Sequence, residues 1–195
     1  LLDRECTQKR PEEEFASVRR EIRERLAEFQ ADWDAHGMPL LNVATKLVAW
    51  PSPFNEIRPA LISCGLASMS APGLINIRHR ITSGGGKDWP EGHGINNVIF
   101  HELLHRYVAA ALDTVLNRTT PLLEKYKDEE PIIRNHLHLY AVEQATYDAA
   151  GLSDVLEEIK RQEMTFPSWP PKQAALEIVA KETKDAFIKE LRGTE

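Results

Sequence analysis

The chain has 195 residues, a hydrophobic fraction of 42% and a formal net charge of -6 at pH 7. A chain of this size and apolar content can bury the core of one domain, so we predict a single domain over residues 1–195. Acids and bases are interspersed and form no basic stripe for a phosphate backbone, so we expect no nucleic-acid partner. No run of about 18 apolar residues occurs in the sequence, which predicts no membrane span.

The first residues bear on compartment and redox state. The chain starts at Leu1 instead of a methionine, so we expect that a precursor segment such as a signal peptide has been removed. A removed signal peptide would favour export slightly over a cytoplasmic location, and the sequence is compatible with both. Cys6 and Cys64 would pair in an oxidising compartment and stay as thiols in the cytosol.

An amphipathic helix is predicted over residues 11–31. Its apolar residues follow the three-and-four spacing of a helix, with charged residues between them: Phe15, Val18, Ile22, Leu26 and Phe29. We expect this helix to pack its apolar face on the core and to carry no chemistry.

About three strands are predicted between Leu41 and Arg80. The segments LNVATKLVAW (41–50), ALISCGLAS (60–68) and LINIRHR (74–80) are rich in apolar and β-branched residues. The turn-forming sequences PSPFN and SAPG separate them. Together these segments would form a small sheet.

Helices are predicted for most of the remaining chain. The segment GINNVIFHELLHRYVAAALDTVLNR (94–118) has a strong helical pattern, and Asn96 or Asn97 could cap its start. Two further helices are predicted to begin at Thr120-Pro121 and at Glu130-Pro131, and the second of them is predicted to end at Gly151. The last two predicted helices cover residues 153–163 and 172–192. The segment FPSWPP between them is predicted to be extended, because prolines cannot continue a helix. The order of helix, small sheet and helices predicts an α+β fold.

The segment FHELLH (100–105) suggests a metal site. His101 and His105 are four residues apart, so on a helix they project from one face about 6 Å apart and can hold one ion. Glu102 is rotated by about 100° and could polarise a metal-bound water. Zinc suits imidazole ligands, so we predict one Zn²⁺ per chain. The alternative is a pair of core histidines bonded to carbonyl oxygens.

This segment resembles the HExxH motif of the zincin metallopeptidases, which lies on an active-site helix beside a small sheet. The resemblance covers this helix and, loosely, the sheet before it and the helices after it. It implies a zincin-like fold, His101 and His105 as zinc ligands, Glu102 as the general base, and LINIRHR as the edge strand that aligns a peptide substrate. The metzincin continuation HExxHxxGxxH is not present, since Val108 and Ala111 occupy its glycine and third histidine positions.

A third zinc ligand is expected on the helix that follows Pro131. His136, Tyr140 and Glu143 form one stripe on that helix, and His136 is our first choice as the ligand. Glu143 and His138 are the alternatives, although His138 points about 200° away from His136. Glu124 has a spacing from His105 that is similar to that of gluzincin ligands, but its charged surroundings suggest a solvated residue.

These residues predict a zinc-dependent metallopeptidase that acts on a peptide or protein substrate. Glu102 would accept the proton of a metal-activated water, and Tyr140 would stabilise the oxyanion. Two alternatives are a non-catalytic zincin-fold scaffold and a metal-dependent hydrolase of a non-peptide substrate. The intact Glu102 argues against the scaffold, since a structural site does not need it. The sequence makes no prediction of oligomeric state.

Overall fold

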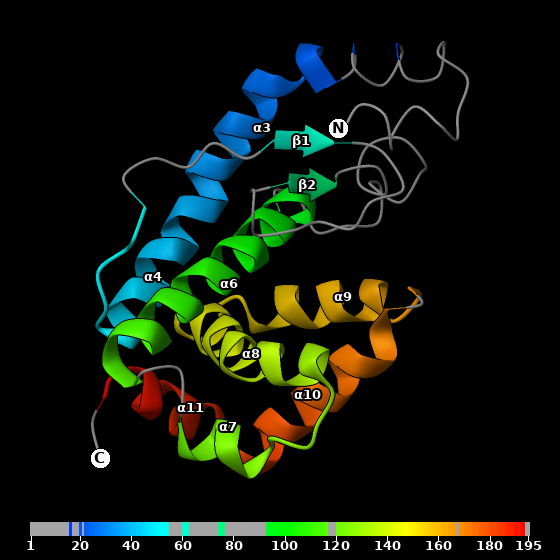
Figure 1. Ribbon diagram of the computed structural model, residues 1–195. Coiled ribbons are helices and arrows are strands. Elements are labelled where there is room, and N and C mark those ends of the chain that lie inside the picture. Colours follow the sequence, from blue (N-terminus) through cyan, green and yellow to red (C-terminus); the bar gives the residue numbers. More distant parts are fainter. Residues whose placement is uncertain are drawn as a thin grey trace. The chain divides into compact units, whose positions relative to one another are not determined.

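The structure is a computed structural model that describes residues 22–54, 60–62, 74–76, 93–116, 120–166 and 168–193, with residues 16 and 20 in addition. The described residues are mostly helical (Figure 1). Their only strands are two segments of three residues each. The prediction of an α+β fold with a three-stranded sheet is therefore wrong, and the fold is mostly helical. Cys6, Cys64 and the end of the LINIRHR segment lie outside the described residues.

The chain divides into two compact units. One unit comprises Leu1–Met38 and Arg58–Glu102, and the other comprises Pro39–Ile57 and Leu103–Glu195. The division falls inside a continuous helix after Glu102, so this helix contributes residues to both units. The prediction of a single domain over residues 1–195 stays a prediction.

A helix of the first unit widens before a proline. Helix α3 (Leu26–Asp32) leads into the π-helical turn η1 (Trp33–Gly37). The wider turn lies directly before Met38-Pro39, where the proline has no N–H for a normal helical hydrogen bond. A Cβ atom at Gly37 would overlap the Trp33 ring, so the glycine allows this ring to pack on the turn.

The predicted helix over residues 11–31 is confirmed only in part. Phe29 is buried as expected, but Leu26 of the same predicted apolar face is 55% exposed. Residues 11–15 and Val18 lie outside the described residues. Helical structure also continues past Ala31 through η1, so the predicted end of this helix is wrong.

The first predicted strand is a helix. Residues 38–48 form α4 (Met38–Val48), although we predicted a strand over 41–50. The buried residues of α4 are Leu40, Leu41, Ala44 and Val48, and their spacing follows the helical period. The β-branched residues of this segment suggested a strand, but burial along one helix face determines the outcome.

The other two predicted strands are confirmed only as short segments. Strand β1 (Ala60–Ile62) pairs in parallel with β2 (Leu74–Asn76), with Leu61 opposite Ile75. The residues between these strands, where we expected turns, lie outside the described residues.

Helix α6 (Gly94–Leu116) confirms the predicted motif-bearing helix. The predicted cap is wrong, because Asn96 and Asn97 lie inside the helix and are buried. The Asn96 side-chain Nδ2 instead donates a hydrogen bond to the carbonyl oxygen of Asp32 at 3.0 Å. In the second unit, the Tyr107 hydroxyl of α6 donates to the carbonyl oxygen of Trp50 at 2.7 Å.

The next two helices begin where the sequence predicts. Helix α7 (Pro121–Lys125) starts after Thr120, whose hydroxyl accepts a hydrogen bond from the Leu123 N–H at 3.1 Å. Helix α8 (Pro131–Ala149) ends two residues before the predicted Gly151, which follows the helix with a φ of 70° that favours glycine. The Leu152 N–H donates to the Tyr147 carbonyl oxygen at 2.8 Å, which completes the C-terminal cap. Helix α9 (Ser153–Glu163) follows.

The last predicted helix is two helices. Helix α10 (Trp169–Glu182) starts within FPSWPP, because prolines are tolerated in the first turn of a helix. We predicted an extended segment over FPSWPP, and this is wrong for residues 169–171, which belong to α10. Helix α10 stops at Thr183, and α11 (Lys184–Leu191) begins after it. No helix of the described residues has the length and apolar character required for a membrane crossing.

Thr183 has a strained backbone, with a φ of 73° that β-branched residues rarely adopt. We expect Thr183→Gly to increase the free energy of unfolding by about 1 kcal/mol. The substitution relieves the backbone strain at positive φ, and this gain exceeds the cost of the greater conformational entropy that glycine loses on folding. Urea unfolding would measure this change. Thr183→Ala is the matched control and should give no such gain, since alanine has the same conflict at positive φ. A destabilised Thr183→Gly variant would contradict the argument.

A buried hydrogen bond joins α8 to α11 in the core of the second unit. The His138 ring is 2% exposed, and its Nε2 lies 2.7 Å from a carboxylate oxygen of Glu190. Burial raises the pKa of Glu190, but hydrogen bonds from His138, Thr120 and the Leu122 N–H outweigh it, so the pKa falls below its usual value of 4.5. The contribution of Glu190 to stability is therefore present above pH 4.5 and is lost as the pH falls below it.

Replacing His138 with alanine should lower the free energy of unfolding by on the order of 3 kcal/mol, because it removes the imidazole hydrogen bond to the Glu190 carboxylate and opens a gap beside Phe187. Glu190→Gln should cause a smaller loss, since the amide can still accept a hydrogen bond. Urea unfolding at pH 7 would compare both variants with the wild type. A His138→Ala variant within about 0.5 kcal/mol of the wild type would show that the pair does not stabilise the fold.

Candidate metal centre

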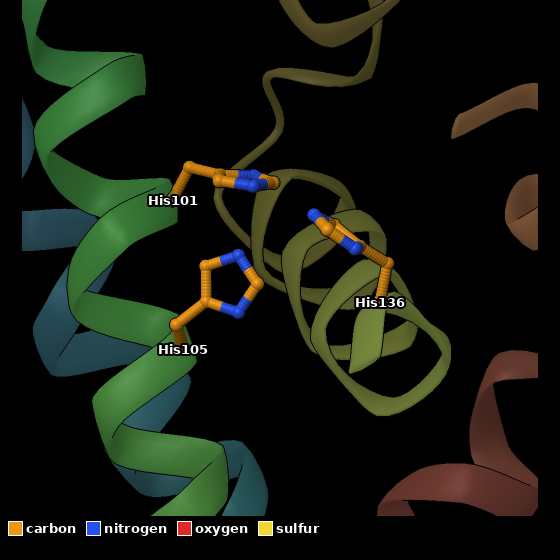
Figure 2. Close-up of side chains that lie close together, drawn as sticks. All are labelled: His101, His105 and His136. Atoms are coloured by element: carbon orange, nitrogen blue, oxygen red, sulfur yellow. The ribbon is translucent and has the colours of Figure 1, made fainter. Parts of the chain in front are cut away.

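Three histidines come together from two helices. His101 and His105 project from α6, and His136 projects from α8 toward them (Figure 2). One nitrogen from each ring can be chosen so that the three lie within 4.8 Å of one another. All three side chains are half-buried. This is the only group of three metal-binding side chains at such distances among the described residues.

The pattern of α6 explains why its two histidines face the same way. Four residues make slightly more than one helical turn, so His101 and His105 lie one above the other. The neighbouring apolar side chains are buried instead: Phe100, Leu103, Leu104 and Val108. The helix therefore buries its apolar face and leaves both imidazoles accessible for a ligand.

The structure also indicates which nitrogen of His136 could bind a metal ion. Its Nδ1 lies 2.6 Å from the carbonyl oxygen of Ile132, one turn earlier on α8. A carbonyl oxygen can only accept, so Nδ1 carries the proton and donates. Nε2 is then the nitrogen with a lone pair that could bind a metal ion, as in zinc sites whose histidines donate the other N–H to a carbonyl group. The ring packs edge-on against His105, with ring centres 4.7 Å apart.

Tyr140 lies beside His136 in the predicted stripe. The two ring centres are 5.2 Å apart, and Tyr140 is 4% exposed. Burial raises the pKa of its hydroxyl far above the usual value of 10, and the charges of Glu143 and Glu163 raise it further. The hydroxyl is therefore protonated at neutral pH and can donate a hydrogen bond. Its role at an oxyanion stays a prediction.

Glu102 follows His101 on α6 and is half-buried. Its position on the helix is the one that the motif predicts, rotated by about 100° from His101. Its role as a general base stays a prediction.

The alternative third ligands lie elsewhere. His138 is bonded to Glu190 in the core, and Glu124 is an exposed residue of α7 that pairs with Lys127 at 2.9 Å. Glu143 is buried on α8 but is not in the histidine group. The geometry therefore favours His136 over these three residues.

The donors of this group fit zinc. Three neutral imidazoles leave a fourth tetrahedral position for water or substrate, which is typical of catalytic rather than structural zinc sites. The hydrogen bond that holds His136 Nδ1 also orients one donor before any ion binds. The identity of the ion stays a prediction.

Some neighbours of the site could not be predicted from the sequence. The pKa of Glu143 is raised to about 8, chiefly by burial and also by the charge of Glu163, although Lys172 and Lys160 act in the opposite direction. These three charged residues lie on or next to α9 and α10, and only tertiary packing makes them neighbours of Glu143. The support of His136 by Ile132 could have been found from the four-residue helical spacing.

Comparison of the chain with protein-family models, with curated proteins and with solved structures gives no match.

Proposed function

We propose that this chain is a zinc-dependent hydrolase that cleaves peptide bonds. The observation that supports this proposal is the group of three histidine nitrogens within 4.8 Å, formed by both histidines of HELLH and by His136. His101, His105 and His136 would hold the ion. The peptide substrate is proposed from the resemblance of HELLH to the zincin motif, since the mostly helical fold adds no support to that choice.

A zinc ion at this site would supply Lewis-acid chemistry, which polarises a carbonyl group and lowers the pKa of a water molecule. The chain itself would handle the proton. The Glu102 carboxylate would take one proton from the attacking water and deliver it to the nitrogen of the leaving amine, while the hydroxide adds to the acyl carbon. Tyr140 would donate its hydroxyl proton in a hydrogen bond to the developing oxyanion.

The proposal can be tested with the full chain and an unstructured protein substrate. The chain would be stripped with a chelator and then reloaded with one equivalent of zinc, with magnesium as the control ion. Mass spectrometry would identify new peptide ends in the substrate. We expect cleavage only in the zinc-loaded sample, because three imidazoles bind zinc far better than magnesium.

Two other outcomes would contradict the proposal in different ways. Stoichiometric zinc binding with no cleavage of any polypeptide would favour the scaffold or a hydrolase of another substrate. A chain that binds no zinc would show that the three histidines are not a metal centre.

A further inference from the structure

Two histidines outside the candidate metal centre lie side by side in the first unit. His36 belongs to η1, and His93 directly precedes α6. Their ring centres are 5.2 Å apart, and their ring planes are inclined at 60° to each other. Both residues belong to the same compact unit. They are far apart in the sequence, so folding, and not helical spacing, brings the two imidazoles together.

The distance between these rings matches that of two imidazoles bound to one metal ion. A zinc–nitrogen bond of about 2 Å places each ring centre about 3 Å from the ion, and a tetrahedral angle then separates the two centres by about 5 Å. The rings of His105 and His136 in the candidate metal centre have a similar separation of 4.7 Å. The spacing of His36 and His93 therefore fits one ion bound by both rings.

A hydrogen bond orients the His36 ring. Its Nδ1 lies 3.2 Å from the carbonyl oxygen of Asp32. A carbonyl oxygen can only accept, so Nδ1 donates, and in the neutral ring Nε2 has the lone pair that could bind an ion. The same carbonyl oxygen accepts a hydrogen bond from Asn96 Nδ2 at 3.0 Å. One oxygen atom thus links the turn that carries His36 to the first turn of α6, next to His93.

His93 is in the protonation state that binds metal ions. The residue is 5% exposed, and burial together with the charge of His36 lowers its pKa below the usual value of 6.5. The ring is therefore neutral at pH 7, and neutral imidazole is the form that coordinates metals. His36 is only half-buried, which leaves an approach for water to complete the coordination of an ion.

We propose that His36 and His93 are the protein ligands of a second metal site, which binds a divalent transition-metal ion such as zinc with water in the remaining positions. Imidazole suits zinc, copper and nickel, whereas magnesium and calcium prefer oxygen ligands. Among the described residues, no third metal-binding side chain joins this pair at the distances found in the candidate metal centre. The second site therefore binds its ion more weakly than three histidines would, and dialysis removes that ion. This inference does not depend on the proposed hydrolysis or on the three-histidine centre.

The test is a calorimetric titration of the metal-free full chain with zinc, with magnesium as the control ion. We expect two binding steps in the wild type, one tight and one weaker, each of one ion per chain. His36→Ala and His93→Ala should each keep the tight step and weaken the other by at least about 10-fold, because only one imidazole of the pair remains. The double variant His101→Ala/His105→Ala should lose the tight step and keep the weaker one.

Nuclear magnetic resonance would identify the ligands directly. In the wild type, the second equivalent of zinc should shift the imidazole resonances of His36 and His93, and magnesium should not. His93 is buried, so its alanine variant could fail to fold, but His36→Ala and this wild-type titration test the proposal without it. His138→Ala is the matched control, because it removes a histidine that is bonded to Glu190, and it should keep both binding steps.

Three results would overturn the proposal. The first is a wild-type chain that shows only the tight step, and the second is a weaker step that persists unchanged in His36→Ala. The third is a set of His36 and His93 ring resonances that do not respond to the second equivalent of zinc. A wild-type chain that lacks the tight step but keeps the weaker one, with loss of that step in His36→Ala, would support this proposal and contradict the proposed zinc-dependent function.

Discussion

Replacing His136 with alanine should remove zinc from the chain. Loss of a residue that only supports a ligand weakens zinc binding by about 10- to 100-fold, and loss of a ligand should weaken it well beyond that range. His136 is the donor from α8, and without it only the two nitrogens of α6 remain in the group. Zinc content after dialysis and chelator competition would measure the effect.

His138→Ala is the matched control for this experiment. It makes the same substitution two residues further along α8, but His138 is bonded to Glu190 in the core and lies outside the group. This variant should be less stable and still bind one zinc ion per chain. If His136→Ala retains wild-type affinity while Glu143→Ala loses it, the carboxylate is the third ligand and our assignment is wrong.

Glu102→Gln should keep zinc and lose peptide hydrolysis by about 100-fold or more. The amide has nearly the shape of the carboxylate, but it cannot accept the proton of the attacking water. His101 and His105 are unchanged, so zinc content should equal that of the wild type. The measurements are initial rates of cleavage of an unstructured protein and zinc content by elemental analysis.

The control for Glu102→Gln is Glu124→Gln, which removes one negative charge from an exposed position of α7. This variant should cleave the substrate at the wild-type rate. Equal rates for Glu102→Gln and the wild type would exclude Glu102 as the general base. Loss of zinc from Glu102→Gln would mean that this carboxylate supports the metal site instead.

The helices after Gly94 could be predicted because their boundaries are encoded locally. Thr120-Pro121, Glu130-Pro131 and Gly151 act through hydrogen bonds and backbone preferences within a few residues, and the structure follows each of them. The break at Thr183 has no such signal, since nothing in its neighbours favours a positive φ. It separates α10 from α11, and α11 carries the Glu190 that pairs with His138.

The segment 38–48 shows where local preference fails. Val43, Thr45 and Val48 suggested a strand, but the burial of Leu40, Leu41, Ala44 and Val48 on one face requires a helix. The candidate metal centre likewise has one part that local sequence determines and one part that it does not. The spacing of His101 and His105 follows from their helix alone, whereas the approach of His136 depends on tertiary packing, so the sequence could only rank candidates for the third ligand.

The hydrogen bond between His136 Nδ1 and the Ile132 carbonyl has a consequence for mutational robustness. The acceptor belongs to the main chain, so the identity of the side chain at position 132 is irrelevant to it. Any sequence that keeps residues 131–136 helical retains this support for the imidazole. A carboxylate partner, in contrast, disappears with one substitution. Position 132 can therefore vary freely during evolution while His136 keeps its orientation.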